Sequence, residues 1–155
     1  MSTIDHISST YHSEVPSGEG LHIGIAVAEW NYNITEPLLE GAPEVLRRQQ
    51  TKKVTVFRVP GAFELVNASA RLLEDPCLDA VITIGCVVRG DTPHFDYICQ
   101  GVTYGISRLN ASCEIPIIYG LLTTNDLQQA KDRSGGKLGN KGDECAIVAI
   151  KMAKF

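Results

Sequence analysis

The sequence predicts an α/β protein, a three-layer α/β/α sandwich around a sheet of four parallel strands. Four short, β-rich apolar segments alternate with segments long enough to form helices, an order that is typical of right-handed βαβ units. The strand segments are almost continuously apolar, as strands are when helices cover both faces of their sheet. No internal repeat or low-complexity linker divides the 155 residues, so we expect a single domain.

The predicted elements follow one another in a regular order. Residues 1–20 are rich in Ser, Thr and Gly and are expected to form a flexible N-terminal arm ahead of one domain over residues 21–155. Hydrophobic periodicity within that domain predicts, in chain order, a strand at 21–28, a helix at 35–49, a strand at 53–59, a helix at 61–73, a strand at 79–88, a helix at 95–111, a strand at 115–122, and two final helices at 125–133 and 141–153.

Local signals support several of these elements. Thr35 is a candidate N-cap for the first helix, and Pro37 fits its first turn. The run DAVITIGCVV at 79–88 is the strongest strand prediction, and Asn140 is a candidate N-cap for the last helix. Pro43 is an anomaly because a proline inside a helix removes a hydrogen bond. The first helix therefore either bends at Pro43 or begins later than predicted.

Composition excludes several classes of protein. With 14 basic and 18 acidic residues the formal net charge is −4, which disfavours general nucleic-acid binding. No apolar run approaches the roughly 18–20 residues of a membrane span, and the first twenty residues lack the basic and apolar regions of a secretory signal. Five cysteines without a CxxC pair or tight Cys–His spacing predict reduced thiols in a cytoplasmic protein, with neither a disulfide framework nor a zinc site.

The residues that follow each strand form the first candidate site, because ligands of open parallel sheets bind outside the carboxyl ends of the strands. In chain order they are Glu29-Trp30-Asn31, Pro60-Gly61-Ala62-Phe63-Glu64, Arg89-Gly90-Asp91-Thr92-Pro93-His94-Phe95 and Thr123-Thr124-Asn125. Together they offer an aromatic ring, carboxylates, a histidine, hydroxyls and glycines at one edge of the sheet. Their clustering is more informative than any one of them.

Each of these residues also has a simpler structural interpretation. Trp30 can cap the core, and His94 can be an ordinary loop histidine. Glu64 stands where a helix is predicted to begin and can complement the helix dipole. Asp91 and the Pro60-Gly61 pair are common turn formers.

A second candidate site lies between the last two helices, at 133–142. Its glycines, the N-terminus of the final helix and the cations Arg133, Lys137 and Lys141 predict an anion site suited to phosphate; the alternative is a solvated basic loop. It is not a Walker A loop, since no GxxxxGK[ST] match exists. Nine helical residues would carry Arg133 about 13 Å from the loop edge. The phosphate site and the loop pocket are therefore expected to belong to different subunits that meet at an interface.

Several segments carry a specific family resemblance. VPGAFE at 59–64, IGCVVRGDTPHFDY at 84–97, GLLTT at 120–124 and the stretch from Gln129 to Gly142 resemble 6,7-dimethyl-8-ribityllumazine synthases, and the resemblance runs from about residue 21 to residue 152. It implies a flavodoxin-like fold and a cytoplasmic transferase of riboflavin biosynthesis. Such an enzyme condenses 5-amino-6-(D-ribitylamino)uracil with 3,4-dihydroxy-2-butanone 4-phosphate, releases phosphate and water, and needs neither cofactor nor metal.

The resemblance also implies roles for individual residues. His94 matches the proton donor and Arg133 the phosphate-binding arginine, which are the two implied catalytic residues. Trp30 matches the aromatic residue that stacks on the pyrimidine, and Tyr119 an aromatic that the neighbouring subunit contributes, usually Phe. The remaining implied substrate-binding residues are Ala62, Phe63, Glu64, Cys86, Val87, Val88, Asp91, Thr92 and Lys141.

The resemblance also implies an oligomeric assembly, and two alternative functions remain. Family members form pentamers; some pair these into decamers, and others pack twelve pentamers into a shell of sixty subunits. The GGKLGN turn at 135–140 matches that of the shell formers and implies the shell. The alternative function is a non-catalytic lumazine- or flavin-binding protein on the same scaffold. A flavodoxin-type electron carrier is a weaker alternative, because no Ser/Thr/Gly-rich phosphate loop follows the first strand.

Overall fold

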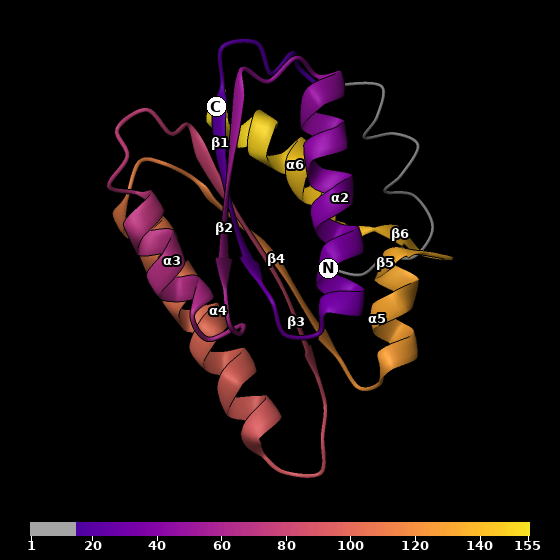
Figure 1. The fold of residues 1–155 in the computed structure, drawn as a ribbon. Coiled ribbons are helices and arrows are strands. Elements are labelled where there is room, and N and C mark those ends of the chain that lie inside the picture. Colours follow the sequence, from indigo (N-terminus) through magenta and orange to yellow (C-terminus); the bar gives the residue numbers. More distant parts are fainter. Residues whose placement is uncertain (1–14) are drawn as a thin grey trace.

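The computed structural model describes residues 15–155 and contains one four-stranded sheet with helices on both faces (Figure 1). In chain order the elements are β1 (His22–Ala28), α2 (Tyr32–Arg48), β2 (Lys53–Val59), α3 (Leu65–Leu72), β3 (Ala80–Val88), α4 (His94–Ser112), β4 (Ile117–Thr124), α5 (Leu127–Arg133), β5 (Ser134–Gly136), β6 (Gly139–Asn140) and α6 (Lys141–Ala153).

The sheet confirms the predicted fold class. Its strand order is β2-β1-β3-β4, and each of the three neighbouring pairs is parallel. This order is the one that flavodoxin-like doubly wound sheets begin with. The chain leaves β1 toward β2 on one side and returns to β3 on the other, so the switch point lies between the carboxyl ends of β1 and β3.

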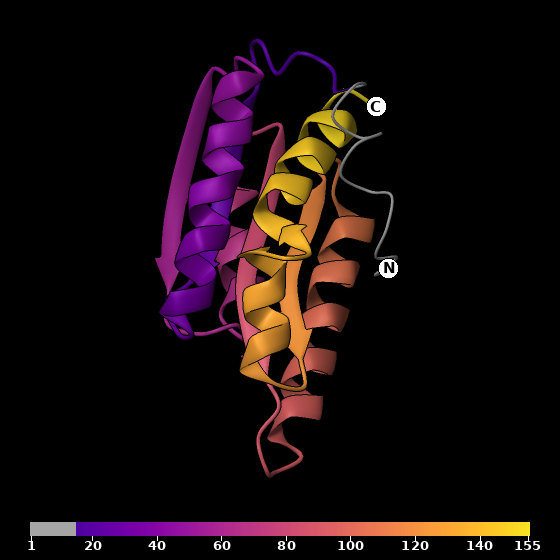
Figure 2. The ribbon, with the colours of Figure 1, turned by 90° about the vertical axis from the view of Figure 1, so that its right-hand side faces the viewer.

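Two apolar cores lie on the two faces of the sheet. Helices α2 and α6 pack side by side on one face, with α5 beside them (Figure 2), and α3 and α4 cover the other. Strand β1 serves both cores by alternation: Ile23, Ile25 and Val27 face α2 and α6, whereas Ala26 and Ala28 face α3 and α4. Strands β1, β3 and β4 are thus largely buried between the helices, which explains their almost continuously apolar sequences. Edge strand β2 differs, since each of its residues is partly or fully exposed.

Helix α2 differs from its prediction. It begins at Tyr32 with Asn31 as N-cap, and Thr35 lies buried inside the helix, so the predicted N-cap is wrong. Asn31 adopts a left-handed conformation with φ of 59°, which asparagine tolerates better than most residues. Pro37 is the sixth residue of the helix and lies inside it, not in its first turn as predicted. The helix continues past Pro43 to Arg48, so it does not begin later than predicted. Burial of Leu38 and Leu46 on either side of Pro43 offsets the lost hydrogen bond.

The segment between α5 and α6 also differs from its prediction, because it forms a small antiparallel hairpin of β5 and β6 rather than a loop. Gly135 and Gly139 have φ of 101° and 83°, values that glycine adopts without the steric cost other residues meet. The last helix begins and ends where predicted, with the Asn140 side chain accepting a hydrogen bond from Gly142 N at 2.8 Å.

The predicted arm is only partly within the described chain, because residues 1–14 lie outside it. Its last part, 15–20, lies against the end of α2: Gly18 N donates to Gln49 O at 2.6 Å, and Glu19 forms a bridge with Thr51. Among the helices of residues 15–155, none is long and apolar enough to cross a membrane.

Candidate active site

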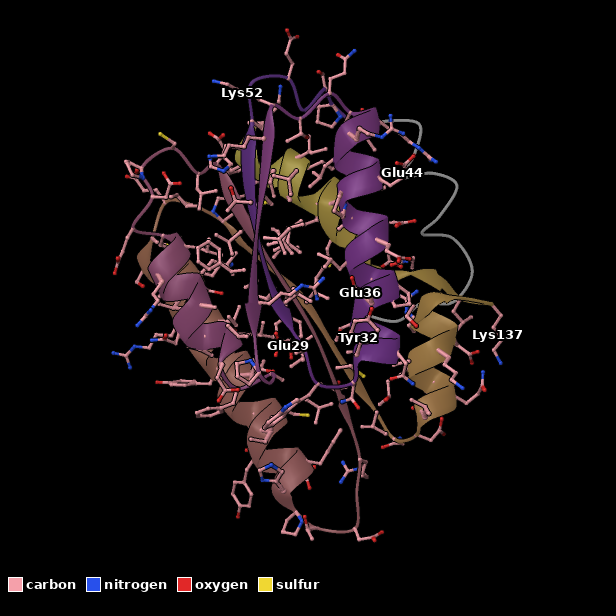
Figure 3. The ribbon with its side chains drawn as sticks, viewed as in Figure 1. Glu29, Tyr32, Glu36, Glu44, Lys52 and Lys137 are labelled. Carbon is pink, nitrogen blue, oxygen red and sulfur yellow. The ribbon has the colours of Figure 1, made fainter. Side chains whose placement is uncertain are left out.

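The carboxyl edge of the sheet brings the four predicted loops together. Helices α2, α4 and α5 all begin at this edge, the lower end of Figure 1. Glu29 and Tyr32, which flank the loop after β1, mark it in Figure 3. The side chain of Asn31 ties the loops across the switch point, because its Nδ2 donates to Cys86 O near the end of β3 at 2.8 Å.

Trp30 lies open on this edge. Its side chain is 67% exposed, which excludes the simpler interpretation that it caps the core. Its backbone N donates to Pro60 O at 2.9 Å, which joins it to the loop after β2. A Cβ on Gly61 would lie only 2.6 Å from Trp30 Cε3. Glycine at position 61 therefore has a role beyond turn formation, because it lets the indole ring lie directly against its Cα.

The turn after β2 adds a carboxylate and a second aromatic ring. Glu64 Oε2 accepts a hydrogen bond from Gly61 N at 3.1 Å, which fixes one carboxylate oxygen and leaves the other available. Ala62 is buried beneath the turn, whereas Phe63 is 58% exposed and lies near Gly101 of α4. Because residues 61–64 form this turn, α3 starts at Leu65 rather than at the predicted Gly61.

The end of β3 and the loop after it supply the remaining residues of this edge. Cys86 is buried, and burial raises the pKa of its thiol to about 11, so it stays protonated and uncharged. Val87 and Val88 are half-buried, and Asp91 and Thr92 are exposed.

His94 is the first residue of α4 and is exposed. No hydrogen bond to its side chain occurs within residues 15–155, so both ring nitrogens face solvent. A solvent-facing imidazole can donate a proton to, or accept one from, a ligand bound at this edge of the sheet.

Tyr119 lies within strand β4, away from the loops at the carboxyl edge of the sheet. It pairs with Thr83 in the middle of the sheet, five residues before the end of β4 and thus about 17 Å from the loop edge. Its hydroxyl shares a hydrogen bond with Thr103 Oγ1 of α4 at 2.7 Å. Burial raises the pKa of this phenol, an effect that the Thr103 hydrogen bond partly offsets. Because β4 is an edge strand, Tyr119 stands near the free side of the sheet.

Arg133 and Lys141 form a second cluster, held together by Glu144. Arg133 Nη2 lies 2.7 Å from Glu144 Oε1, and Lys141 Nζ lies 3.1 Å from Glu144 Oε2. Arg133 also donates to Leu138 O across the hairpin. Burial alone would raise the pKa of Glu144, but hydrogen bonds and charge from Arg133 and Lys141 hold it below its ordinary value. The cluster therefore carries two positive charges and one negative charge, a net positive site open to an anion.

Lys137 does not belong to this cluster. It pairs with Asp132 at 3.2 Å and stands on the outer side of the molecule beside α5 (Figure 3). The three cations of the predicted anion site are thus divided by the hairpin. Sequence reasoning missed Glu144, although its spacing of three residues from Lys141 at the start of a helix was a visible signal.

The described chain keeps the two clusters apart. Among residues 15–155, neither Arg133 nor Lys141 forms a hydrogen bond or ion pair with the loops that carry Trp30 and His94. Nor is any group of three or more His, Cys, Asp or Glu side chains in this part of the chain placed to hold a metal ion. One protomer therefore presents an aromatic pocket edge at one place and an anion site at another.

Comparisons with known proteins agree on one family. A sequence model described as 6,7-dimethyl-8-ribityllumazine synthase matches residues 20–155. The chain is 58% identical to a protein of that name from Phocaeicola vulgatus, over all of this chain and 94% of the relative. It is 58% identical to a protein of that name from Porphyromonas gingivalis, over 99% of this chain and 97% of the relative. It is 56% identical to one from Parabacteroides distasonis, over 97% of this chain and 95% of the relative.

Proposed function

Because this chain belongs to the 6,7-dimethyl-8-ribityllumazine synthase family, we propose that two neighbouring copies of it build each active site. The protein is a transferase of riboflavin biosynthesis that condenses 5-amino-6-(D-ribitylamino)uracil with 3,4-dihydroxy-2-butanone 4-phosphate. Its products are 6,7-dimethyl-8-ribityllumazine, phosphate and water. The relatives' names do not favour the alternative of a non-catalytic binding protein.

The pocket edge of one protomer binds the pyrimidine. The exposed Trp30 ring stacks on the heterocycle, and Phe63 with Ala62 closes its side. The free oxygen of Glu64 accepts a hydrogen bond from a ribityl hydroxyl, since Gly61 already occupies the other oxygen. Three residues at the end of β3, namely Cys86, Val87 and Val88, line the pocket beside the ribityl chain.

His94 moves the protons of the reaction. The amine attacks the ketone to form a carbinolamine, which loses water to give an imine. Phosphate then leaves, and the second nitrogen attacks the remaining carbonyl carbon and closes the ring with loss of a second water. An imidazole can both donate and accept these protons, and general acid–base catalysis of this kind typically contributes about 10²- to 10⁴-fold to the rate. Asp91 and Thr92, in the same loop, lie beside the butanone phosphate.

The neighbouring protomer supplies the phosphate site. Its Arg133 and Lys141 bind the phosphate group and offset the charge of the departing anion, and its Tyr119 ring closes the pocket. The observation that carries this proposal is the separation of the two clusters: Arg133 is paired with Glu144, away from its own chain's Trp30 and His94. Holding two substrates in register across the interface accounts for much of the remaining acceleration.

Mixing two inactive variants tests the shared site. His94→Ala and Arg133→Ala each disable one half of a pocket, so a ring refolded from equal amounts regains an intact pocket at about a quarter of its interfaces. Lumazine fluorescence should then report about a quarter of wild-type activity. Each parent refolded alone is the control, and mass spectrometry of the assemblies proves mixing. Mixed rings without a gain in activity would exclude the shared site.

A second mixture gives an independent answer. Here wild type is refolded with an equal amount of the double variant His94→Ala/Arg133→Ala. If each pocket is shared, it needs two wild-type neighbours, and about a quarter of wild-type activity should remain; if each pocket lies within one chain, about half should remain.

The assembly and location belong to the same proposal. The family acts on small molecules and forms oligomers, and we propose pentamers that pack into a sixty-subunit shell, supported by the turn at Gly135–Asn140. Light scattering should report about 1,000 kDa, sixty times 16.8 kDa, and a value near 84 kDa would limit the assembly to one pentamer. We place the single domain, residues 21–155, in the cytoplasm, where its five free cysteines stay reduced.

A further inference from the structure

The loop that carries the reacting groups has little to hold it. Gly90 to Pro93 connect β3 with α4, and all four residues are exposed, as is His94. A Cβ on Gly90 would meet nothing within 4 Å. Within the described chain, the side chains of Asp91, Thr92 and His94 accept or donate no hydrogen bond. The position of the His94 imidazole therefore depends on how the two ends of this loop are fixed.

Arg89 fixes both ends. Its backbone N donates to Thr124 O at 2.9 Å, which anchors the start of the loop to the end of β4. Its guanidinium reaches across the loop to the first turn of α4, where Nη2 and Nη1 bind the two Asp96 carboxylate oxygens at 2.9 and 3.3 Å. The guanidinium carbon also lies 4.2 Å from the centroid of the Phe95 ring.

A third contact ties this arrangement to the next loop. Arg89 Nε donates to Asn125 Oδ1 at 3.2 Å, and Asn125 N donates to Gln129 Oε1 at the start of α5. One guanidinium thus joins the loop after β3, the first turn of α4 and the loop after β4. The pairing with Asp96 raises the pKa of Arg89, so its charge persists at every pH at which the protein is folded.

We propose that Arg89 is a positioning residue for the reaction: it clamps the two residues that follow His94 and thereby sets where the imidazole stands. This inference rests on the proposed role of His94. An exposed ion pair contributes little to stability, whereas a displacement of about 1 Å in a reacting group can cost about 10²-fold in rate. Removing the clamp should therefore affect kcat far more than folding.

Lysine cannot replace this arginine. The clamp uses the planar fork toward Asp96, the third nitrogen toward Asn125 and the flat face over Phe95 at the same time. An ammonium group carries the charge but has neither the fork nor the face.

The experiment compares Arg89→Gln with Arg47→Gln. Arg47 also binds a glutamate, Glu44, through two nitrogens on an exposed surface, but it lies at the far end of α2. We expect Arg89→Gln to lower kcat by about 10- to 100-fold while lumazine affinity, measured by fluorescence titration, changes less than about threefold. Arg89→Lys should recover only a small part of kcat, and Arg47→Gln should match wild type. Both Gln variants should have similar midpoints of thermal unfolding.

A double variant separates positioning from general structure. Since Arg89 acts through His94, Arg89→Gln should cost less than about threefold in kcat when introduced into His94→Ala, because effects on one shared group are not additive. Asp96→Asn, which removes the carboxylate at constant size, should reproduce the loss if Arg89→Gln fails to fold.

The outcomes distinguish this inference from the proposed function. Loss of kcat in His94→Ala with wild-type kcat in both Arg89→Gln and Asp96→Asn overturns the positioning role alone. Wild-type kcat in His94→Ala overturns the proposed proton transfer and, with it, the inference. Equal losses from Arg89→Gln with and without His94 would show that Arg89 acts on something else.

Discussion

Substituting Gly61 with alanine should displace the Trp30 ring without disturbing the fold. An added Cβ would lie 2.6 and 2.8 Å from two ring carbons, Cε3 and Cζ3, where carbon atoms normally stay about 3.5–4.0 Å apart. The ring must therefore move by about 1 Å. Gly61 is not among the residues with positive φ, so alanine is compatible with the backbone and the perturbation is purely steric.

The size of the effect follows from the exposure of the ring. Because Trp30 is 67% exposed, its ring can move toward solvent, and the free energy of unfolding should fall by no more than about 0.5 kcal/mol. Stacking of a base on an aromatic side chain is worth about 1–3 kcal/mol. Loss of about 1 kcal/mol of that would weaken pyrimidine binding roughly fivefold.

Steady-state kinetics with lumazine fluorescence as the readout would test this expectation. The KM for the pyrimidine should rise in Gly61→Ala, while the KM for the butanone phosphate stays unchanged. Adding Trp30→Phe should restore pyrimidine binding, because a phenyl ring lacks the fused-ring atoms that the Cβ meets. An unchanged KM in the folded single variant, or no recovery in the double variant, would refute stacking on Trp30 as the basis of binding.

Two further predictions concern titratable groups. Arg133 and Lys141 hold the pKa of Glu144 below the ordinary 4.5, so ionised Glu144 should stabilise the fold above pH 4.5, and this stabilisation should be lost as the pH falls through the folded pKa. Glu144→Gln should therefore weaken the decrease in the thermal unfolding midpoint at the acidic end of a series from pH 3 to 7. An unchanged decrease in the variant would contradict the prediction. Burial raises the pKa of Cys86 and Cys145 to about 11, whereas Cys77 is exposed. Iodoacetamide at pH 8 should therefore modify Cys77 in the native protein and reach the two buried thiols only after unfolding, as peptide mass mapping would show.

The sheet was predictable because its signal is local. Strands β1, β3 and β4 are short, mostly apolar runs, as strands covered on both faces are. Edge strand β2 carries polar residues and is exposed. The last helix was predicted at its observed bounds, since Asn140 is a strong N-cap and apolar residues such as Ile147 and Ile150 recur at helical spacing behind it. The place of the candidate site could be predicted from the same strand pattern, because the carboxyl ends of parallel strands lie at one edge of their sheet and ligands bind there.

Tertiary contacts decided what the local pattern did not. Asn31, not Thr35, is the N-cap of α2: its backbone is left-handed and its carbonyl accepts from Ile34 N and Thr35 N. Its side chain makes no bond to the helix and is instead held by Cys86 O, 55 positions along the chain. Proline 43 stays inside α2 because apolar burial on the core face outweighs one missing hydrogen bond. The role of Gly61 beyond turn formation comes from the Trp30 ring, 31 positions earlier.

The fold class, the family and the two sets of candidate residues follow from the amino-acid sequence, because these depend on neighbours along the chain and on motifs that can be read in order. The pairing of the cations depends on the folded chain: Lys137 pairs with Asp132, while Arg133 and Lys141 both pair with Glu144. The tertiary structure also decided that Arg89 joins two loops and the first turn of α4. The physical reason is that an ion pair depends on distance in space, and spacing along the chain does not specify that distance once a hairpin or a loop reverses its direction.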